Sequence, residues 1–125
     1  MTATARAIEM TKIAATAAAD KIGENLVALD VSEPFVLADT FLIVSGRNER
    51  QVSAISDGIE EAMHLAGHKL LRREGKSTGR WVLLDFGDII AHVMHEEDRV
   101  FYDIERLWKD CPTISLDGIT REPAL

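Results

Sequence analysis

This 125-residue sequence contains a single cysteine and no long apolar run. Its single cysteine, Cys111, has no partner in the chain for a disulfide, which favours a reducing compartment. No apolar stretch approaches the ~20 residues that a membrane-spanning helix needs. The first 19 residues mix charges with alanines and threonines, so they do not resemble a signal peptide. We therefore expect a cytoplasmic protein without a membrane segment.

Basic residues are also in short supply, since 14 Lys and Arg stand against 21 Asp and Glu and the formal net charge is −7. Nucleic-acid binding through phosphates needs clustered Lys and Arg, so we expect no specific nucleic-acid site. Charge complementarity favours a basic protein partner instead. A surplus of acid also serves solubility alone, and that alternative stays open.

The length and the 46% of hydrophobic residues fit one globular domain with a modest core. We place this domain at residues 1–110. Residues 111–125 show no period and contain Gly118 and Pro123, so we expect them to form a mobile tail.

Residues 81–95 form the stretch around which we expect the chain to be organised. Two apolar runs are separated there by a polar joint that contains Gly87. In the first run, Val82 and Leu84 alternate with Trp81 and Leu83, so both faces of an extended chain are mostly apolar. This pattern predicts a central strand, followed after Gly87 by a second strand from Ile89.

The rest of the chain alternates helical and strand patterns. Helices are predicted over residues 4–22, 49–66 and 96–109, with Gly23 ending the first and Asn48 capping the second. We expect the third helix to bury a stripe of Phe101, Ile104, Leu107 and Trp108. Further strands are predicted over residues 26–31, 40–44 and 68–73. The order predicts an α/β fold, a mixed sheet of about five strands flanked by helices.

The predicted strand at residues 68–73 and the loop after it are basic, with Lys69, Arg72, Arg73, Lys76 and Arg80 close in sequence. Edge strands commonly carry such charges because they discourage pairing with other molecules. We prefer this interpretation to a patch that contacts phosphate.

Nothing in the sequence assembles an active site. Asp85 and Asp88 are an acid pair suited to nucleotidyl transfer, but their spacing does not ensure convergence on ions ~4 Å apart, and no third carboxylate matches. His92 and His95 point to opposite faces of a strand. No Ser or Cys has a nearby base. We predict no catalytic, metal or cofactor site.

Apolar and aromatic residues near the organising stretch instead indicate a protein interface. They are of the types enriched at the buried centres of interfaces: Trp81, Leu83, Ile90, Met94, Tyr102 and Trp108. Packing in the core is the alternative, and we favour it for Ile90 and Trp108. Trp81 is the best candidate for an interface because it faces away from Val82 and Leu84.

Several motifs resemble one known family in order along residues 8–108. They are Ala38-Asp39, Phe41-Leu42-Ile43, Ser45-Gly46, Arg50-Gln51-Val52, Glu74-Gly75, Trp81, Asp85, Gly87-Asp88, His92-Val93-Met94, Phe101-Tyr102, Glu105 and Leu107-Trp108. The chain thereby resembles the ribosomal silencing factor family, RsfS or Iojap. Ser45 and Asn48 depart from the Thr and Ser that are commoner in the family, and the segment after Trp108 lies outside the resemblance.

The resemblance implies a fold related to nucleotidyltransferases but without their catalytic carboxylates. It implies a regulator without enzymatic activity that binds the fourteenth protein of the large ribosomal subunit. Docked there, it would sterically block joining of the small subunit and repress translation when nutrients are short. It also implies a homodimer when free. A nucleotide-binding or nucleotidyltransferase-like enzyme and a purely structural homodimer remain the alternatives.

Combined with the pattern of apolar residues, the resemblance predicts a set of partner-binding residues. An apolar centre would be ringed by acids that complement a basic ribosomal protein. The predicted residues are Trp81, Leu83, Asp85, Asp88, His92, Met94, Tyr102 and Glu105.

Overall fold

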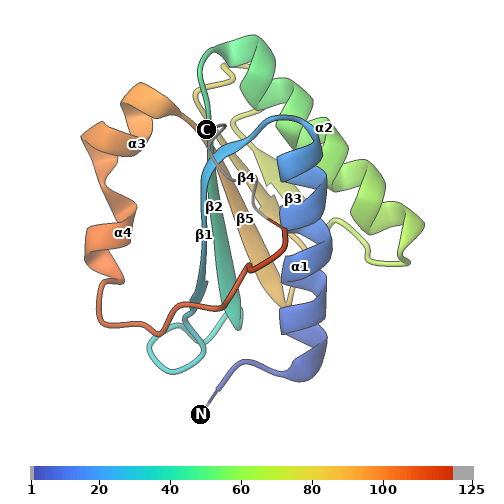
Figure 1. The fold of residues 1–125 in the computed structure, drawn as a ribbon, viewed down its shortest axis with the longest axis vertical. Helices are drawn as coiled ribbons and strands as arrows, with labels where there is room; N and C mark the ends of the chain where they lie inside the picture. The colour runs from blue at the N-terminus through green and yellow to red at the C-terminus, as the bar shows by residue number, and fades with distance from the viewer. Residues whose placement is uncertain (1, 120–125) are drawn as a thin grey trace.

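The fold is an α/β sandwich, seen here in a computed structural model that describes residues 2–119 (Figure 1). Its elements alternate as the sequence predicts, with shifted ends. In chain order they are α1 (Ala5–Asp20), β1 (Glu24–Asp30), β2 (Thr40–Gly46), α2 (Glu49–Leu65), β3 (Arg72–Glu74), β4 (Trp81–Asp85), β5 (Ile89–His95), α3 (Glu96–Tyr102) and α4 (Ile104–Leu107).

The five strands form one mixed sheet in the order β1-β2-β5-β4-β3. Strands β2 and β5 run parallel, from the pair Thr40 and Ile89 to the pair Gly46 and His95, and the other neighbours are antiparallel. The predicted mixed five-stranded sheet is confirmed.

The central strand is β5, and our assignment of that place to the Trp81 strand is wrong. All seven residues of β5 are buried, whereas β4 alternates half-buried and buried residues. The reason is that β5 lies between β2 and β4, while β4 has only the three-residue edge strand β3 beyond it. Apolar residues on both faces of a strand therefore did not establish its place in the sheet.

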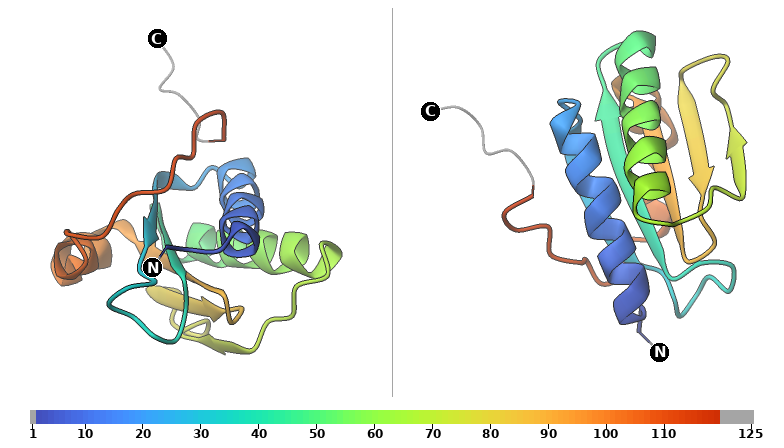
Figure 2. Two further views of the ribbon diagram at one scale, coloured as in Figure 1. Left: turned by 90° about the horizontal axis from the view of Figure 1, so that it is seen from below. Right: turned by 90° about the vertical axis from the view of Figure 1, so that its right-hand side faces the viewer.

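Two unequal layers cover the sheet. Helices α1 and α2 lie on one face and α3 and α4 on the other (Figure 2). A larger apolar cluster fills the first side, where Met10, Leu42 and Ile59 are fully buried. A smaller cluster on the second side is built around Phe41, Ile43 and Met94. The sheet thus separates two cores.

The end of α1 differs from the prediction at Gly23. Ile22 adopts the left-handed conformation at φ 63°, and the amide of Gly23 donates to the carbonyl of Ala18 over 2.9 Å. Gly23 is required for a different reason, because a Cβ there would lie 2.6 Å from Cγ2 of Val44. Because the turn packs closely on β2, glycine is required at position 23. The left-handed conformation is therefore adopted by the preceding residue, the β-branched Ile22.

The second helix begins and ends as predicted. The Asn48 side chain accepts a hydrogen bond from the amide of Gln51 over 2.8 Å, and Gly67 follows the helix with φ 86°. The edge position predicted for the basic strand is also confirmed, although β3 is shorter than residues 68–73. Arg73 of β3 pairs with Glu60 of α2 at 2.7 Å.

The predicted third helix is in fact two short helices, α3 and α4. Asp103 between them takes a left-handed conformation at φ 46°, which changes the helix direction. The apolar stripe therefore does not continue across the break. Phe101 and Leu107 are 80% and 77% exposed, whereas Ile104 is buried and Trp108 half-buried against the second cluster.

The chain beyond α4 follows the outer edge of β1. Thr113 forms a bridge with Leu29, and the amide of Ile114 donates to the carbonyl of Ala28 over 2.8 Å. Leu116 is buried in the first cluster. The sequence misses this contact because it involves too few residues to show a period. Mobility of the tail stays a prediction, and Pro123 lies outside the described residues.

Candidate functional site

The second face of the sheet is covered less completely than the first. Trp81, Leu83 and Asp85 of β4 are half-buried on this side, while Val82 and Leu84 on the opposite side are fully buried. Helices α3 and α4 lie toward the β1 and β2 side of this face (Figure 2, left), and the Trp81 end of β4 reaches Tyr102 of α3. The alternation predicted for Trp81 is confirmed.

Trp81, Leu83 and Tyr102 form a surface that we call the Trp81 surface. The ring of Trp81 lies against that of Tyr102, with centroids 5.1 Å apart, and Tyr102 is 50% exposed. Phe101 packs edge-on against Tyr102 at 5.0 Å. Strand β4 and helix α3 therefore contribute aromatic rings to one partly exposed surface, a composition typical of interface centres.

Two of the predicted partner-binding residues lie beside this surface on β5 and are buried. Met94 is fully buried, and it pairs with Trp81 in the register of β4 and β5. His92 is also buried, and its Nδ1 accepts a hydrogen bond from Trp81 Nε1 over 3.1 Å. Burial lowers the pKa of His92 to about 4, so its ring is neutral near pH 7. Both residues support Trp81 from within.

The three predicted acids each have a partner inside the chain. Asp85 Oδ1 accepts from the amide of Gly87 over 2.8 Å, which stabilises the turn after β4. Asp88 pairs with Arg6 of α1 at 3.0 Å. Glu105 pairs with Arg99 at 2.8 Å. The acids thus come from different elements, and each already has a partner within the chain.

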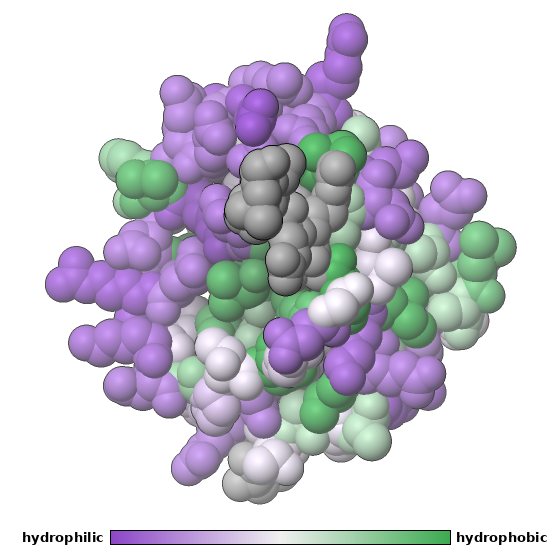
Figure 3. Space-filling view, viewed as in Figure 1, coloured by the Kyte–Doolittle hydropathy of each residue, from purple (hydrophilic) through white to green (hydrophobic). Residues whose placement is uncertain are grey.

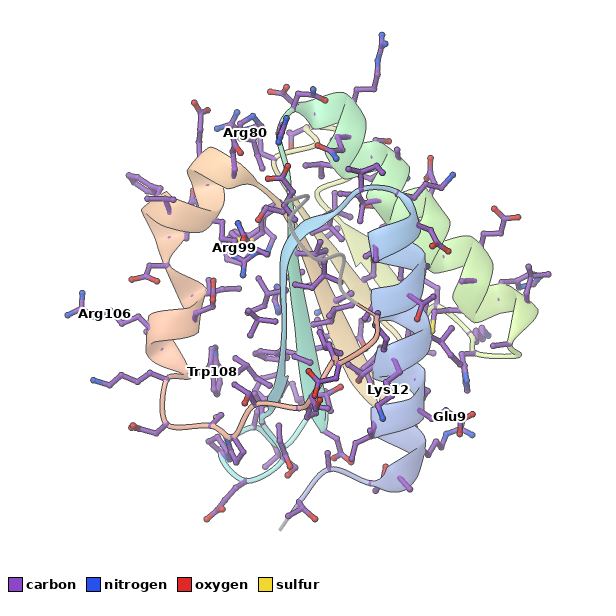
Figure 4. The ribbon with its side chains drawn as sticks, in the orientation of Figure 1. Glu9, Lys12, Arg80, Arg99, Arg106 and Trp108 are labelled. Carbon is purple, nitrogen blue, oxygen red and sulfur yellow. The ribbon has the colours of Figure 1, made fainter. Side chains whose placement is uncertain are left out.

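Two arginines attach α3 to the rest of the fold. Arg99 is buried, and its guanidinium donates to Ser45 Oγ over 2.8 Å as well as to Glu105. In Figure 4, Arg99 points from α3 toward the sheet, whereas Arg106 points away. Arg80 pairs with Asp98, Glu97 of α3 and Glu49 of α2, and its hydrogen bond with Asp98 is the largest cause of its raised pKa.

Several exposed apolar residues were missed by the sequence analysis. Val36 and Leu37 in the loop between β1 and β2 are 93% and 74% exposed, and the adjacent Phe35 packs into the second cluster. Val100 of α3 is 81% exposed. Apolar atoms stand out over α3 from a hydrophilic surface (Figure 3). The run Phe35-Val36-Leu37 directly after Pro34 was the available signal, since turns seldom carry three apolar residues.

The arrangement of His, Cys, Asp and Glu side chains was compared with that of a metal site over the part of the chain that the structure describes. Residues 2–119 contain no group of three or more His, Cys, Asp and Glu side chains that could hold an ion. Asp85 and Asp88, the acid pair considered for nucleotidyl transfer, have different partners on different elements. Over the same residues, no helix has the length and apolar character to cross a membrane.

Comparisons with known proteins agree on one family. A family model described as "Ribosomal silencing factor during starvation" matches residues 4–124. A ribosomal silencing factor of Halalkalibacterium halodurans is 40% identical over 111 residues, which cover 89% of this chain and 95% of that protein. Another, from Bacillus subtilis, is 42% identical over 106 residues, covering 85% and 90%. A crystal structure of a Chromobacterium violaceum protein, 32% identical, has a TM-score of 0.79 and covers 93% of this chain and 88% of that one.

Proposed function

The chain belongs to the ribosomal silencing factor (RsfS) family, and from this premise we propose that it binds the large ribosomal subunit through the fourteenth protein of that subunit. Bound there, it blocks joining of the small subunit and represses translation during nutrient limitation. Family membership itself gives a ribosome-associated role in translation silencing, and the docking site and the steric block are the proposed part.

The Trp81 surface is the observation that carries this proposal. It holds two aromatic rings and a leucine, all partly exposed, on the face that the short helices leave half-covered. Trp and Tyr are the residue types that dominate the energy of protein interfaces. The chain's formal charge of −7 favours a basic partner, which a ribosomal protein supplies.

A steric block requires no catalytic group, and we propose that the protein is a regulator and not an enzyme. The names of its relatives describe silencing factors. The enzyme alternative needs carboxylates that converge on metal ions, and Asp85 and Asp88 are directed to separate partners. The proposed place of action is the cytoplasm, where joining ribosomal subunits are found.

We further propose that the free protein is a homodimer that uses the Trp81 surface. The same half-covered apolar residues that suit a ribosomal protein would bury themselves against a second copy. In that case dimer formation and ribosome binding exclude one another.

Co-sedimentation with isolated large subunits tests the proposed function. The Trp81→Ala variant should bind about 30-fold more weakly than the unmodified protein, which corresponds to about 2 kcal/mol for a residue central to an interface. Leu65→Ala is the matched control, because Leu65 is a 78% exposed apolar residue on α2. Equal affinities of Trp81→Ala and Leu65→Ala, both folded, would move the interface elsewhere; no co-sedimentation of the unmodified protein would contradict the proposal itself.

A further inference from the structure

We propose that His92 is a positioning residue for Trp81: it does not touch the partner, but its Nδ1 fixes the indole in the orientation that the partner recognises. This inference rests on the proposed function, since it concerns the same surface. It assigns to a buried residue a role in binding, and it also specifies which chemical groups the surface presents.

The hydrogen bond between the two side chains defines the state of the imidazole. Trp81 Nε1 can only donate, so His92 Nδ1 must accept over the 3.1 Å between them. A neutral ring that accepts at Nδ1 carries its hydrogen on Nε2. Burial keeps His92 neutral, since its pKa is lowered to about 4. The imidazole is therefore held in one tautomer.

That tautomer leaves the N–H at Nε2, the other ring nitrogen, without an acceptor in the described part of the chain. His92 Nε2 is buried without a hydrogen-bond partner among residues 2–119, and the neighbouring ring is Phe41, with centroids 4.9 Å apart at 75°. A buried donor without an acceptor destabilises a fold by about 1–3 kcal/mol. An apolar side chain at position 92 would avoid this cost. Packing alone thus does not account for a histidine there, whereas its bond to Trp81 does.

The indole is held from two elements. Nδ1 of His92 on β5 accepts a hydrogen bond from the indole N–H. The ring of Tyr102 on α3 packs beside the indole, with the two centroids 5.1 Å apart. Fixing both rings before binding lowers the entropy lost when the partner docks. Since the indole's single donor is used inside the protein, Trp81 offers the partner only its ring face and edge. The structure therefore assigns an apolar or cationic partner group to this position, and not a hydrogen-bond acceptor.

Amide substitutions at position 92 provide the test. His92→Asn places an oxygen near the position of Nδ1 and keeps the acceptor for Trp81, whereas His92→Gln places its oxygen near the position of Nε2. His92→Leu removes the acceptor altogether. We would measure the affinity of each variant for isolated large subunits. We would also record the indole N–H resonance of Trp81 by NMR, assigned with the Trp108→Phe variant.

His92→Leu and His92→Gln should bind about tenfold more weakly, with a shifted indole resonance, and His92→Asn should bind within about threefold of the unmodified protein. In a Trp81→Phe background, which lacks the N–H, His92→Leu should cause no further loss. Unchanged affinity of folded His92→Gln or His92→Leu would overturn the positioning role. The role would also be overturned if His92→Leu weakened binding as much in the Trp81→Phe background as it does in the unmodified protein. If the unmodified protein did not bind, the proposed function would fail first.

Discussion

The two faces of the sheet are made by the same strands but are covered in different ways. Helices α1 and α2, of 16 and 17 residues, pack on one face and enclose the larger apolar cluster. On the opposite face, the helices that the structure describes are α3 and α4, of 7 and 4 residues. On the first face the strands contribute aliphatic side chains such as Leu42 and Leu84, and both are fully buried. The second face is aromatic and partly exposed.

Buried polar groups occur on both sides but differ in kind. The first side buries hydroxyls such as those of Thr11 and Thr40, which bond to one another over 2.6 Å. His92 and Arg99 both belong to the second side, where one supports Trp81 and the other attaches α3. A protein that needed only stability would cover both faces alike with apolar residues, because buried ion pairs contribute little to stability. The contrast supports our proposal that the second face carries the function, while the first maintains the fold.

The adjacent residues Leu84 and Leu83 test this contrast most strongly. Leu84→Ala should lower the free energy of unfolding by about 3 kcal/mol, because it leaves a cavity in the closed first core. Leu83→Ala, on the half-covered face, should cost less stability but weaken binding to large subunits. Urea unfolding and co-sedimentation of both variants measure the two effects. If folded Leu84→Ala lost more affinity for large subunits than Leu83→Ala, the division into a face for stability and a face for binding would be contradicted.

Acid should destabilise the second face through His92. The pKa of His92 is about 4 in the folded state and near 6.5 in the unfolded chain, so the unfolded state binds more protons between these values. Stability from this residue is therefore complete above pH 6.5 and is lost as the pH falls to about 4, by roughly 3 kcal/mol. Urea midpoints across that range measure it. The loss should shrink in His92→Asn, and an equal loss in that variant would assign it to other groups.

How α3 is attached gives a third comparison. Arg99→Met should lower the free energy of unfolding by about 2 kcal/mol, since it leaves Ser45 and Glu105 without their buried partner. Arg80→Met is the control, because the Arg80 side chain is 36% exposed against 10% for Arg99, and ion pairs nearer the surface contribute less. Thermal unfolding of both variants compares them. A greater loss for Arg80→Met would show that surface ion pairs, and not Arg99, hold α3.

The smallest effect is expected at the strained turn after α1, on the first side. Ile22→Gly should raise the free energy of unfolding by about 1 kcal/mol, because glycine adopts the left-handed φ of 63° without strain. Binding to large subunits should not change. Gly23→Ala should instead destabilise the protein, since its Cβ would meet Val44. If Ile22→Gly altered the affinity, the turn would belong to the functional side.

The parts of the fold with strong periodicity could be predicted from the sequence. Helix α2 was predicted with its cap at Asn48, and the sheet was predicted with its strand number and edge strand. The break at Asp103 could not be predicted, because neither Gly nor Pro marks it. The place of β5 at the centre depends on pairing with β2, which lies far away in sequence.

The candidate site could be predicted only in part, for similar reasons. Alternation along β4 correctly separated Trp81 and Leu83 from the buried Leu84. It could not show that Met94 and His92 are buried, because that depends on what packs above β5. The partners of the acids were equally hidden, since Arg6 and Asp88 are 82 residues apart.

The most direct test of the account is an assay of subunit joining by light scattering. Small subunits are mixed with large subunits that have been incubated with the unmodified protein, Leu83→Ala or Leu65→Ala. We expect the unmodified protein and Leu65→Ala to reduce joined ribosomes equally, and Leu83→Ala to require a higher concentration for the same effect. Full joining on large subunits saturated with the unmodified protein, or equal inhibition by Leu83→Ala, would contradict the claim that the half-covered face carries out silencing.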